Sequence, residues 1–406
     1  MKQPIQRVIL IVMDSVGIGK AHDADKFGDE GSNTLGHIAS WAKKNKHDFA
    51  LPNLSKLGLG RLLPEYKSEA PYIGSSARLS EISAGKDTTT GHWEIAGTPL
   101  SEPFSFYPNG FSSELVEEWI KKAKLPGVLG NCVGSGTAII DKYAQEHMDT
   151  GKPILYTSSD SVFQVAAHEK TFGLKKLYSA CEIARKLTLP LKIGRVIARP
   201  FIGSDSKFKR VSAHRKDYSL EPPKPNMLDL IAKKYPVASV GKIDDIFCHR
   251  SIEFKNHTGN NVDSGKAVIK FLSTVKEGLI FANFIDFDQE WGHRRDPLGY
   301  LNCLKEFDLY LDKLIPKLKA HDLLIITADH GNDPTYRGSD HTRENIPLLV
   351  YSSNKMFKAL NLGEARSFCH IAKLILEALG IEPKKMPALE TCESFYNQII
   401  SKELSK

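Results

Sequence analysis

The stretch Leu323–His341, LLIITADHGNDPTYRGSDH, decides the fold class of this chain. It opens with the apolar run Leu323–Thr327, which is too short for a helix and is typical of a buried strand. Asp329 and His330 follow that run, where open α/β sheets bind their ligands. A carboxylate and an imidazole together suit divalent metals such as Mn and Zn. The stretch therefore predicts a strand of an α/β sheet that delivers metal ligands at its carboxyl end.

A second acid–histidine pair, Asp340–His341, closes the same stretch. The residues between the two pairs are rich in glycine, asparagine and proline, which is typical of turns. A loop of this composition can bring His341 back toward Asp329. The alternative is that Asp329 caps the following helix and that the histidines lie on the surface.

The composition indicates a large globular protein with an ordinary charge balance. A chain of 406 residues can bury a large core, and we expect two domains. The net charge of +7, from 55 basic and 48 acidic residues, suits an anionic substrate. The basic residues form no aromatic-rich face of the kind that nucleic-acid binding needs, so no nucleic-acid partner is expected.

Cysteine usage and hydropathy bear on the compartment. The six cysteines are far apart and form no CxxC motif, which predicts reduced thiols in an intracellular protein. The N-terminal apolar run Val8–Met13 is too short for a signal peptide, and no segment approaches a membrane span. The expected compartment is the cytoplasm, with no membrane partner.

Two more apolar runs end in acidic residues. Val8–Met13 is followed by Asp14, and Leu279–Ile285 is followed by Asp286 and Asp288. One such Asp is commonplace, because Asp starts turns and caps helices. Three strands that each deliver an Asp are harder to explain in that way, and they favour a shared metal site.

The remaining pattern alternates strands with helices. Val237–Val240 and Ile346–Tyr351 are further apolar runs, whereas Asp296–Leu318 and Ala365–Leu379 have helical spacing. This alternation predicts an α/β fold with a doubly wound, mostly parallel sheet.

The middle of the chain breaks this pattern. Prolines interrupt it early, and the run 221–225 (EPPKP) can form neither a helix nor a central strand. We predict an inserted α+β domain over 101–221 and a metal-binding core formed by 1–100 and 222–406.

The stretch Ala84–Glu94, AGKDTTTGHWE, places three threonines between two glycines. A threonine hydroxyl is a weak nucleophile that metal coordination can activate. The alternative is a helix start in which Asp87 or Thr88 is the N-cap.

The stretch Asp286–Asp296, DFDQEWGHRRD, adds Asp288 and His293 to the candidate ligands. Arg294 and Arg295 could hold a phosphate, or form a surface salt bridge with Asp296. The candidate ligands suffice for two metals, which stabilise the attacking and leaving oxygens in phosphoryl transfer, with a threonine between them as nucleophile. These ligands are Asp14, Asp288, His293, Asp329, His330 and His341.

These motifs together resemble the phosphopentomutase family of the alkaline phosphatase superfamily, and the resemblance spans essentially the whole chain. The motifs that carry it are VMDSVGIG (12–19), GKDTTTGHWE (85–94), YTSSDSV (156–162), GRVIARPFIG (194–203), the stretch around Lys242, DFDQEWGHRRDPLGY (286–300), TADHGNDP (327–334) and SDHTRE (339–344).

The resemblance implies an alkaline-phosphatase-like catalytic core with an inserted cap domain, and interconversion of ribose 1-phosphate and ribose 5-phosphate, or of their 2-deoxy forms. Thr88 would be the phosphorylated nucleophile, although Thr89 or Thr90 remains an alternative. A ribose 1,5-bisphosphate intermediate would form, and glucose 1,6-bisphosphate would prime the enzyme. Two Mn²⁺ ions would be bound, one by Asp288, His293 and His341, and the other by Asp14, Asp329 and His330.

The resemblance also implies substrate-binding residues in the insert. Ribose and its distal phosphate would be held by Ser158, Asp160, Arg195 and Arg210, although a surface ion pair is an alternative for the two arginines. Lys242 would bind phosphate, but the following residues 247–253 depart from the small, glycine-containing loop of the family. A monomer is expected.

Two other readings of the sequence stay open. One is a metal-dependent phosphomonoesterase or a phosphoglycerate-mutase-like enzyme on the same core. The other is a binding or structural protein whose metals only stabilise the fold.

Overall fold

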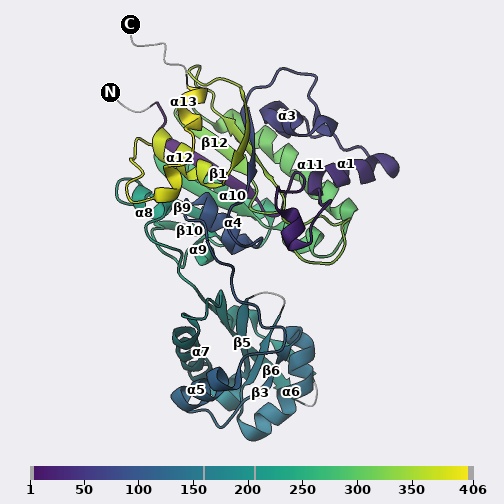
Figure 1. Cartoon of the computed structure of the whole chain (residues 1–406), viewed down its shortest axis with the longest axis vertical. Helices are drawn as coiled ribbons and strands as arrows, with labels where there is room; N and C mark the ends of the chain where they lie inside the picture. Colours follow the sequence, from purple (N-terminus) through teal and green to yellow (C-terminus); the bar gives the residue numbers. More distant parts are fainter. Residues whose placement is uncertain (1–3, 159–160, 205–206, 401–406) are drawn as a thin grey trace. The chain divides into compact units, whose positions relative to one another are not determined.

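The computed structural model describes residues 4–158, 161–204 and 207–400 (Figure 1). The chain divides into two compact units. The first combines Met1–Glu102 with Pro222–Lys406, and the second is Pro103–Glu221. The second unit is therefore inserted into the sequence of the first.

The first unit is built on an eight-stranded sheet in the order β10-β9-β11-β1-β12-β13-β2-β14. At its centre, β11 (Gly278–Phe284), β1 (Arg7–Met13) and β12 (Asp322–Thr327) pair in parallel. All three strands are buried throughout, as expected of apolar strands covered on both faces. β13 (Ile346–Tyr351) runs antiparallel to both neighbours. The predicted α/β class with a mostly parallel sheet is confirmed.

The other elements of this unit flank the central strands. The outer strands are β2 (Ser75–Ser80), β9 (Val237–Val240), β10 (Phe254–Asn256) and β14 (Asn361–Arg366). The helices are α1 (Thr34–Lys44), α2 (Pro52–Leu54), α3 (Gly60–Leu62), α4 (Thr88–Ile95), α8 (Met227–Ile231), α9 (Ile243–Ile246), α10 (Asn261–Thr274), α11 (Pro297–Leu314), α12 (Cys369–Ala378) and α13 (Phe395–Ile399).

One predicted helix begins later than the sequence indicated. The prediction over Ala365–Leu379 is wrong at its start, because residues 361–366 form strand β14, which pairs in parallel with β2. Ser367, with a φ of 138°, ends the extended segment, and α12 begins at Cys369. All five predicted strands and the helix over 296–318 are found close to their expected positions.

The inserted unit is a six-stranded mixed sheet with helices on both faces. Its strands are β3 (Leu129–Val133), β4 (Ile154–Thr157), β5 (Val162–His168), β6 (Arg195–Ser204), β7 (Lys207–Arg210) and β8 (Lys216–Ser219). Its helices are α5 (Ser113–Ala123), α6 (Gly136–Thr150) and α7 (Leu174–Thr188).

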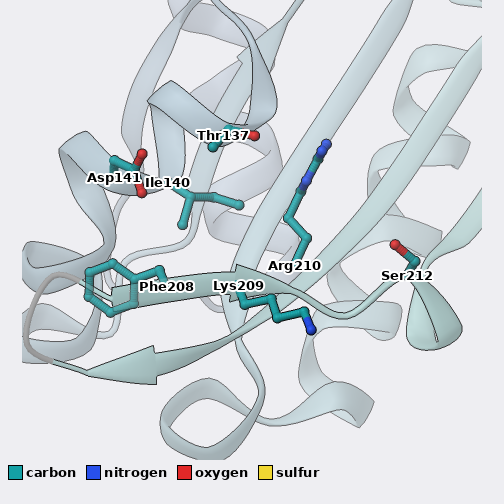
Figure 2. A pocket seen from close by; sticks show the side chains of 7 residues that line it. All are labelled: Thr137, Ile140, Asp141, Phe208, Lys209, Arg210 and Ser212. Atoms are coloured by element: carbon teal, nitrogen blue, oxygen red, sulfur yellow. The ribbon is translucent and has the colours of Figure 1, made fainter.

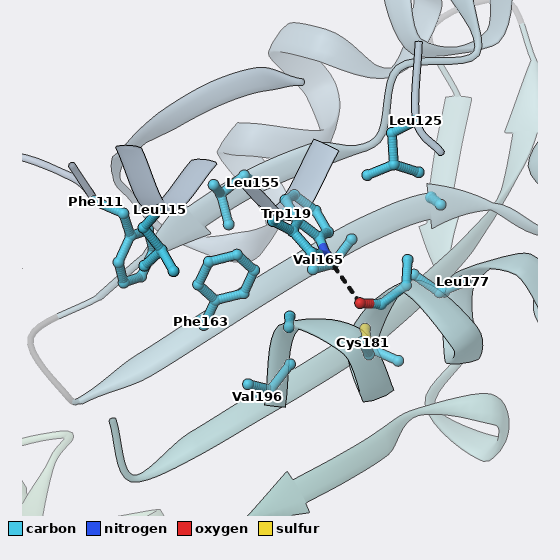
Figure 3. Close-up of a cluster of buried hydrophobic side chains, with 14 of the residues drawn as sticks. Phe111, Leu115, Trp119, Leu125, Leu155, Phe163, Val165, Leu177, Cys181 and Val196 are labelled. Atoms are coloured by element: carbon cyan, nitrogen blue, oxygen red, sulfur yellow. Dashed lines mark hydrogen bonds between the residues drawn. The ribbon is translucent and has the colours of Figure 1, made fainter. Parts of the chain in front are cut away.

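Side chains that alternate along β5 give the insert two apolar layers. Phe163 and Val165 pack with α5 and α7, whereas Ala166 packs with α6. Trp119 anchors the first layer, because it is fully buried and donates its indole N–H to the carbonyl oxygen of Ala180 at 2.8 Å (Figure 3). The insert therefore has a hydrophobic core of its own.

Two expectations about the chain as a whole can be compared with the structure. All six cysteines carry free thiols. Within the described ranges, no helix combines the length and the apolar character needed to cross a membrane.

Candidate metal centre

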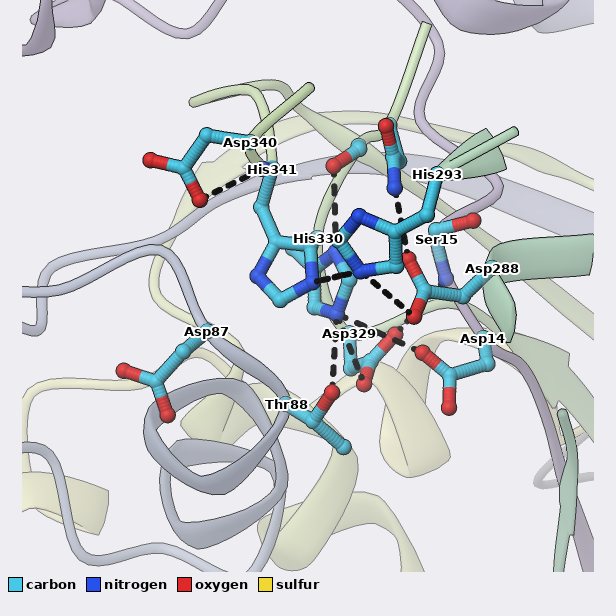
Figure 4. Close-up of polar contacts among 12 residues, drawn as sticks. Asp14, Ser15, Asp87, Thr88, Asp288, His293, Asp329, His330, Asp340 and His341 are labelled. Atoms are coloured by element: carbon cyan, nitrogen blue, oxygen red, sulfur yellow. Dashed lines mark hydrogen bonds and ion pairs between the residues drawn. The ribbon is translucent and has the colours of Figure 1, made fainter. Parts of the chain in front are cut away.

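Three neighbouring strand ends supply the acidic residues of the candidate metal centre (Figure 4). Asp14 directly follows β1, Asp288 lies shortly beyond β11, and Asp329 lies shortly beyond β12. Because these strands are adjacent and parallel, their carboxyl ends meet at one edge of the sheet. The three acids, which are far apart in sequence, therefore lie together.

The first ligand group consists of Asp14, Asp329 and His330, whose candidate ligand atoms all lie within 4.8 Å of one another. Nε2 of His330 is 3.3 Å from Oδ1 of Asp14 and 3.4 Å from Oδ2 of Asp329. All three side chains are buried.

The carboxylates of this group are not satisfied by the protein. Oδ1 of Asp329 accepts the backbone N–H of Ser15 at 3.0 Å. Its Oδ2 and both oxygens of Asp14 accept no hydrogen bond from the part of the chain that the structure describes, although they are buried. Buried carboxylates are costly unless they are paired or coordinate a metal. These orphaned oxygens, together with an imidazole, fit a divalent cation such as Mn²⁺ or Zn²⁺.

The second ligand group lies beside the first. Nε2 of His293 is 3.2 Å from Oδ2 of Asp288, and Nε2 of His341 is 3.5 Å from its Oδ1. The two Nε2 atoms are 3.1 Å apart. Asp288 and His341 also form a compact candidate group with His330, so His330 stands between the two groups. The structure thus brings all six predicted metal ligands together.

Backbone contacts orient two of the imidazoles. Nδ1 of His330 faces the carbonyl oxygen of Gly331 at 3.0 Å, and Nδ1 of His293 faces that of Ser339 at 2.8 Å. A carbonyl oxygen only accepts, so each Nδ1 carries the proton. Each ring therefore presents Nε2 to the carboxylates, which is the arrangement that metal-binding histidines use.

The local charges favour ionised carboxylates. Burial alone would raise the pKa of Asp288, but the charge of His341 and hydrogen bonds from His293 and His341 hold that pKa well below its usual range. Burial also disfavours a charged His330, yet Asp329 and Asp14 raise its pKa well above the usual value. A cation bound here would replace that proton.

Thr88 faces the ligand groups from the first turn of α4. Its hydroxyl oxygen lies 3.1 Å from Nε2 of His330. Asp87 is the N-cap and accepts the N–H groups of Thr89 and Thr90 at 3.0 and 3.2 Å. The helix-start reading with Asp87 as the cap is therefore correct, and it is also what holds Thr88 at the metal centre. Thr90, by contrast, donates its hydroxyl to Asp87.

Lys242 also reaches the metal centre. It precedes α9, and its Nζ is 3.7 Å from Oδ2 of Asp14. This ammonium lies next to an unsatisfied carboxylate, where an anionic group could also contact it.

The atypical loop that follows Lys242 is held by side chains. His249 and Ser251 adopt left-handed conformations, with φ values of 61° and 60°. Nδ1 of His249 bonds Asp244 at 2.6 Å, and the hydroxyl of Ser251 donates to Asp229 at 2.7 Å. These bonds offset the strain of conformations that favour glycine.

A third group of possible metal ligands lies near this loop and consists of Asp244, Asp245 and His257. Nζ of Lys255 already lies 2.9 Å from Oδ1 of Asp244. The ammonium already supplies a positive charge beside Asp244, and the other two members of this cluster are exposed.

The arginines of the GHRRD segment are engaged by the protein. Arg294 pairs with Glu290 at 2.6 Å, and Arg295 donates to Asn332, to the carbonyl oxygen of Asp333 and to that of Asp340. Phosphate binding by these arginines stays a prediction. Among the described residues neither arginine pairs with Asp296, which instead caps α11 through Oδ1.

The substrate-binding residues expected in the insert are only partly brought together. Ser158 follows β4 and Arg195 begins β6 at the same edge of the insert sheet. Arg195 lies 3.8 Å from Asp217, as the ion-pair alternative predicted. Arg210 pairs with residue 201, six positions further along β6, so its backbone lies away from that edge, although its guanidinium reaches back to Gly136. Asp160 lies outside the described residues.

Arg210 instead lines a pocket of about 320 Å³ between α6 and β7 (Figure 2). A guanidinium nitrogen of Arg210 and the hydroxyl of Tyr156 lie 3.4 and 2.8 Å from the point where a Cβ would stand on Gly136. That hydroxyl is buried and has no hydrogen-bond partner within the described ranges. Positive charge, an unpaired hydroxyl and a helix amino end thus converge, which suits an anion.

Several supporting residues were missed by the sequence analysis. Asn332 donates its amide to Oδ1 of Asp288 at 2.8 Å, and His92 contacts Asp329. Both residues lie within quoted motifs. His92 is four positions after Thr88, which places both on one helix face, so that spacing was an available signal.

Comparison with known proteins first defines the class. A family model described as the Metalloenzyme superfamily matches residues 6–383. Together with the two groups of metal-capable side chains, this match supports metal dependence.

Curated relatives then define the family. The chain is 50% identical over 387 residues to phosphopentomutase of Caldanaerobacter subterraneus subsp. tengcongensis, covering 93% of this chain and 95% of that one. It is 49% identical over 383 residues to that of Carboxydothermus hydrogenoformans, covering 93% and 97%. It is 44% identical over 406 residues to that of Pseudoalteromonas translucida, covering 97% and 98%. The chain belongs to the phosphopentomutase family, as its motifs predicted, and it is an enzyme of the mutase type.

Proposed function

We propose that this chain interconverts ribose 1-phosphate and ribose 5-phosphate, and their 2-deoxy forms, through a phosphorylated Thr88. The observation that supports this most is the position of Thr88. Its hydroxyl lies 3.1 Å from Nε2 of His330, the residue that belongs to both groups of metal-capable side chains. Phosphoryl transfer needs mainly positioning and charge neutralisation, and both are available at this point.

We further propose that two Mn²⁺ ions bind here. Asp14, Asp329 and His330 would hold one ion, and Asp288, His293 and His341 the other. When bound, two such cations neutralise charge on the phosphoryl oxygens and lower the pKa of a coordinated hydroxyl. The orphaned oxygens of Asp14 and Asp329 support this proposal.

The proposed cycle conserves phosphate between enzyme and sugar. Phospho-Thr88 gives its phosphoryl group to the free hydroxyl of a pentose monophosphate, so the bond to Thr88 breaks and a sugar bisphosphate forms. The bisphosphate turns around, and its other phosphoryl group returns to the Thr88 oxygen. Glucose 1,6-bisphosphate, or ribose 1,5-bisphosphate, would phosphorylate Thr88 at the start.

We assign substrate binding to the insert and catalysis to the unit that carries Thr88. The pocket beside α6, lined by Arg210 and Lys209, supports a phosphate there. Ser158, Asp160 and Arg195 would contact the sugar. Lys242, close to Asp14, would hold the phosphate that is transferred.

The wider setting of the proposal follows from composition. Pentose phosphates are anionic, in keeping with a net charge of +7. The free thiols suit the cytoplasm. We propose a monomer, with neither nucleic acid nor a membrane as partner.

The first experiment separates a mutase from a phosphatase. The Mn²⁺-loaded protein is given ribose 5-phosphate with a trace of glucose 1,6-bisphosphate, and ribose 1-phosphate and free phosphate are measured. We expect ribose 1-phosphate with little free phosphate. Free phosphate without ribose 1-phosphate would instead identify a phosphomonoesterase. Activity on phosphoglycerates alone would favour the phosphoglycerate-mutase-like alternative.

The second experiment tests the nucleophile. Thr88→Ala is expected to abolish isomerisation, because no hydroxyl remains to carry the phosphoryl group, while Mn²⁺ binding by calorimetry persists. Thr89→Ala is the matched control, since Asp87 caps the helix through the Thr89 backbone N–H. Isomerisation retained in Thr88→Ala and lost in Thr89→Ala would move the nucleophile to Thr89. A purely structural metal site predicts no turnover in the wild type.

A further inference from the structure

Helix α4 lies so close to the end of β12 that only a glycine fits at position 91, where the two segments meet. A Cβ placed on Gly91 would lie 2.2 Å from the carbonyl oxygen of Asp329. Any larger residue would therefore push the helix away from the strand end. The helix that carries Thr88 is thus packed directly against the segment that carries a metal ligand.

The next residue, His92, links the same two segments through its side chain. It is fully buried. Its Nδ1 is 2.8 Å from the carbonyl oxygen of Thr88, one turn back along α4, and 3.1 Å from Oδ2 of Asp329. Both neighbouring oxygens are acceptors, so Nδ1 carries a proton.

Strand β11 holds the other side of the His92 ring. The amide of Asn283, in β11, donates to Nε2 at 3.1 Å, and the ring stacks on Phe281 with centroids 5.9 Å apart. These contacts fix the orientation of the ring, with Nδ1 turned toward Thr88 and Asp329.

Other side chains of α4 already hold the helix in place. Trp93 donates to the carbonyl oxygen of Ile246 at 3.1 Å. The buried carboxylate of Glu94 accepts the backbone N–H groups of Ser83 at 2.7 Å and Phe368 at 2.8 Å. His92 is therefore not needed to dock the helix, and its polar contacts require another explanation.

We propose that His92 is a positioning residue that fixes Asp329 relative to Thr88. It aims Oδ2 of Asp329 at the metal position and sets the distance between that ligand and the nucleophile. This inference rests on the metal-binding role proposed above for Asp329. Outer residues that orient metal ligands typically contribute 10–100-fold to metal affinity.

The test compares Mn²⁺ affinities of chelator-treated full-length proteins by calorimetry. His92→Gln removes the donor at the Nδ1 position and is expected to weaken Mn²⁺ binding by about 10-fold or more. His92→Asn keeps an amide donor near that position and is expected to recover much of the affinity. In assays, His92→Gln should lower kcat more than it raises KM.

His370→Gln is the matched control. His370 is also a buried histidine of the same unit, with Nδ1 facing the carbonyl oxygen of Ser367 and Nε2 accepting the Glu393 N–H. Its contacts within the described residues include none of the proposed ligands, so its replacement should leave Mn²⁺ affinity unchanged. Equal losses in both variants, or unchanged affinity in His92→Gln, would overturn the proposal.

A spectroscopic measurement decides the matter if the His92 variants do not fold. In ¹⁵N-histidine spectra of the metal-free wild type, Nδ1 of His92 should carry a proton, since it faces two acceptor oxygens. A ring with no proton on Nδ1 would refute the positioning role. A wild type that binds no Mn²⁺ would instead refute the proposed function, so the two failures are distinguishable.

Discussion

Both ends of strands β1 and β12 carry buried charged residues, which are hydrogen-bonded at the amino end and, within the described residues, mostly without hydrogen bonds at the carboxyl end. At the amino end, Arg7 and Asp322 stand opposite each other in the strand register and form two hydrogen bonds of 2.9 and 2.8 Å. Arg7 also donates to the carbonyl oxygens of Leu272 and Val275, at the end of α10. The charges of Arg7 and Asp322 are therefore both satisfied by hydrogen bonds within the protein.

At the carboxyl end the same strands deliver Asp14 and Asp329, which are equally buried, but three of their four oxygens accept no hydrogen bond within the described part of the chain. Nε2 of His330, itself a candidate ligand atom, lies 3.3 and 3.4 Å from two of these oxygens, and Nδ1 of His92 lies 3.1 Å from one of them without hydrogen-bond geometry. The contrast shows that burial of charge alone does not mark a functional site. The informative feature is a buried charge that the fold has left unsatisfied.

We call the amino end, with its hydrogen-bonded Arg7–Asp322 pair, the closed end, and the carboxyl end, with its unsatisfied carboxylate oxygens, the open end. The largest expected effect on stability is at the closed end. Asp322→Ala leaves the Arg7 guanidinium buried without its carboxylate, and should lower the free energy of unfolding by about 3–5 kcal/mol. Urea denaturation of the metal-free protein measures this loss. Mn²⁺ affinity per folded molecule should not change, because the pair lies at the opposite strand end.

The control for this prediction removes both charges. Arg7→Met combined with Asp322→Leu replaces the pair by apolar side chains and should cost much less than the single substitution. If Asp322→Ala destabilised the protein by less than the double variant, the amino end would not be a closed ion pair.

The next effect is at the open end. Mn²⁺ at about 100 times its dissociation constant should stabilise the wild type by roughly 2.7 kcal/mol, and Asp14→Asn should lose most of this gain. Without metal, Asp14→Asn should destabilise the protein less than Asp322→Ala does, because Asp14 accepts no hydrogen bond within the described residues and loses only its charge interactions with His330 and Lys242, 3.3 and 3.7 Å away.

Thermal unfolding with and without chelator measures both quantities. A metal-free Asp14→Asn protein that is destabilised as much as Asp322→Ala would contradict the contrast between the two strand ends. In that case Asp14 would be a structural residue like Asp322.

The open end was largely predictable from sequence, for a physical reason. A buried parallel strand is a continuous apolar run, so the first acid after it is visible, as for Asp14 and Asp329. Edge strand β14 (NLGEAR) is mostly exposed and has no such run, so part of it was mistaken for helix. The position of His330 between both ligand groups depends on how separate segments pack, and spacing along the chain does not encode it.

The smallest expected effects come from replacing two adjacent arginines at the open end, Arg294 and Arg295, which should differ in their effect on Mn²⁺ affinity. Arg294 forms an exposed pair with Glu290, so Arg294→Ala should change stability by less than about 0.5 kcal/mol and leave Mn²⁺ affinity unchanged. Arg295 holds Asn332, which in turn holds Asp288, and it also holds the backbone of Asp340, next to His341. Arg295→Ala should therefore weaken Mn²⁺ binding severalfold through these ligands, as calorimetry would measure. Equal affinities for the two variants would mean that the open end is held rigid without Arg295.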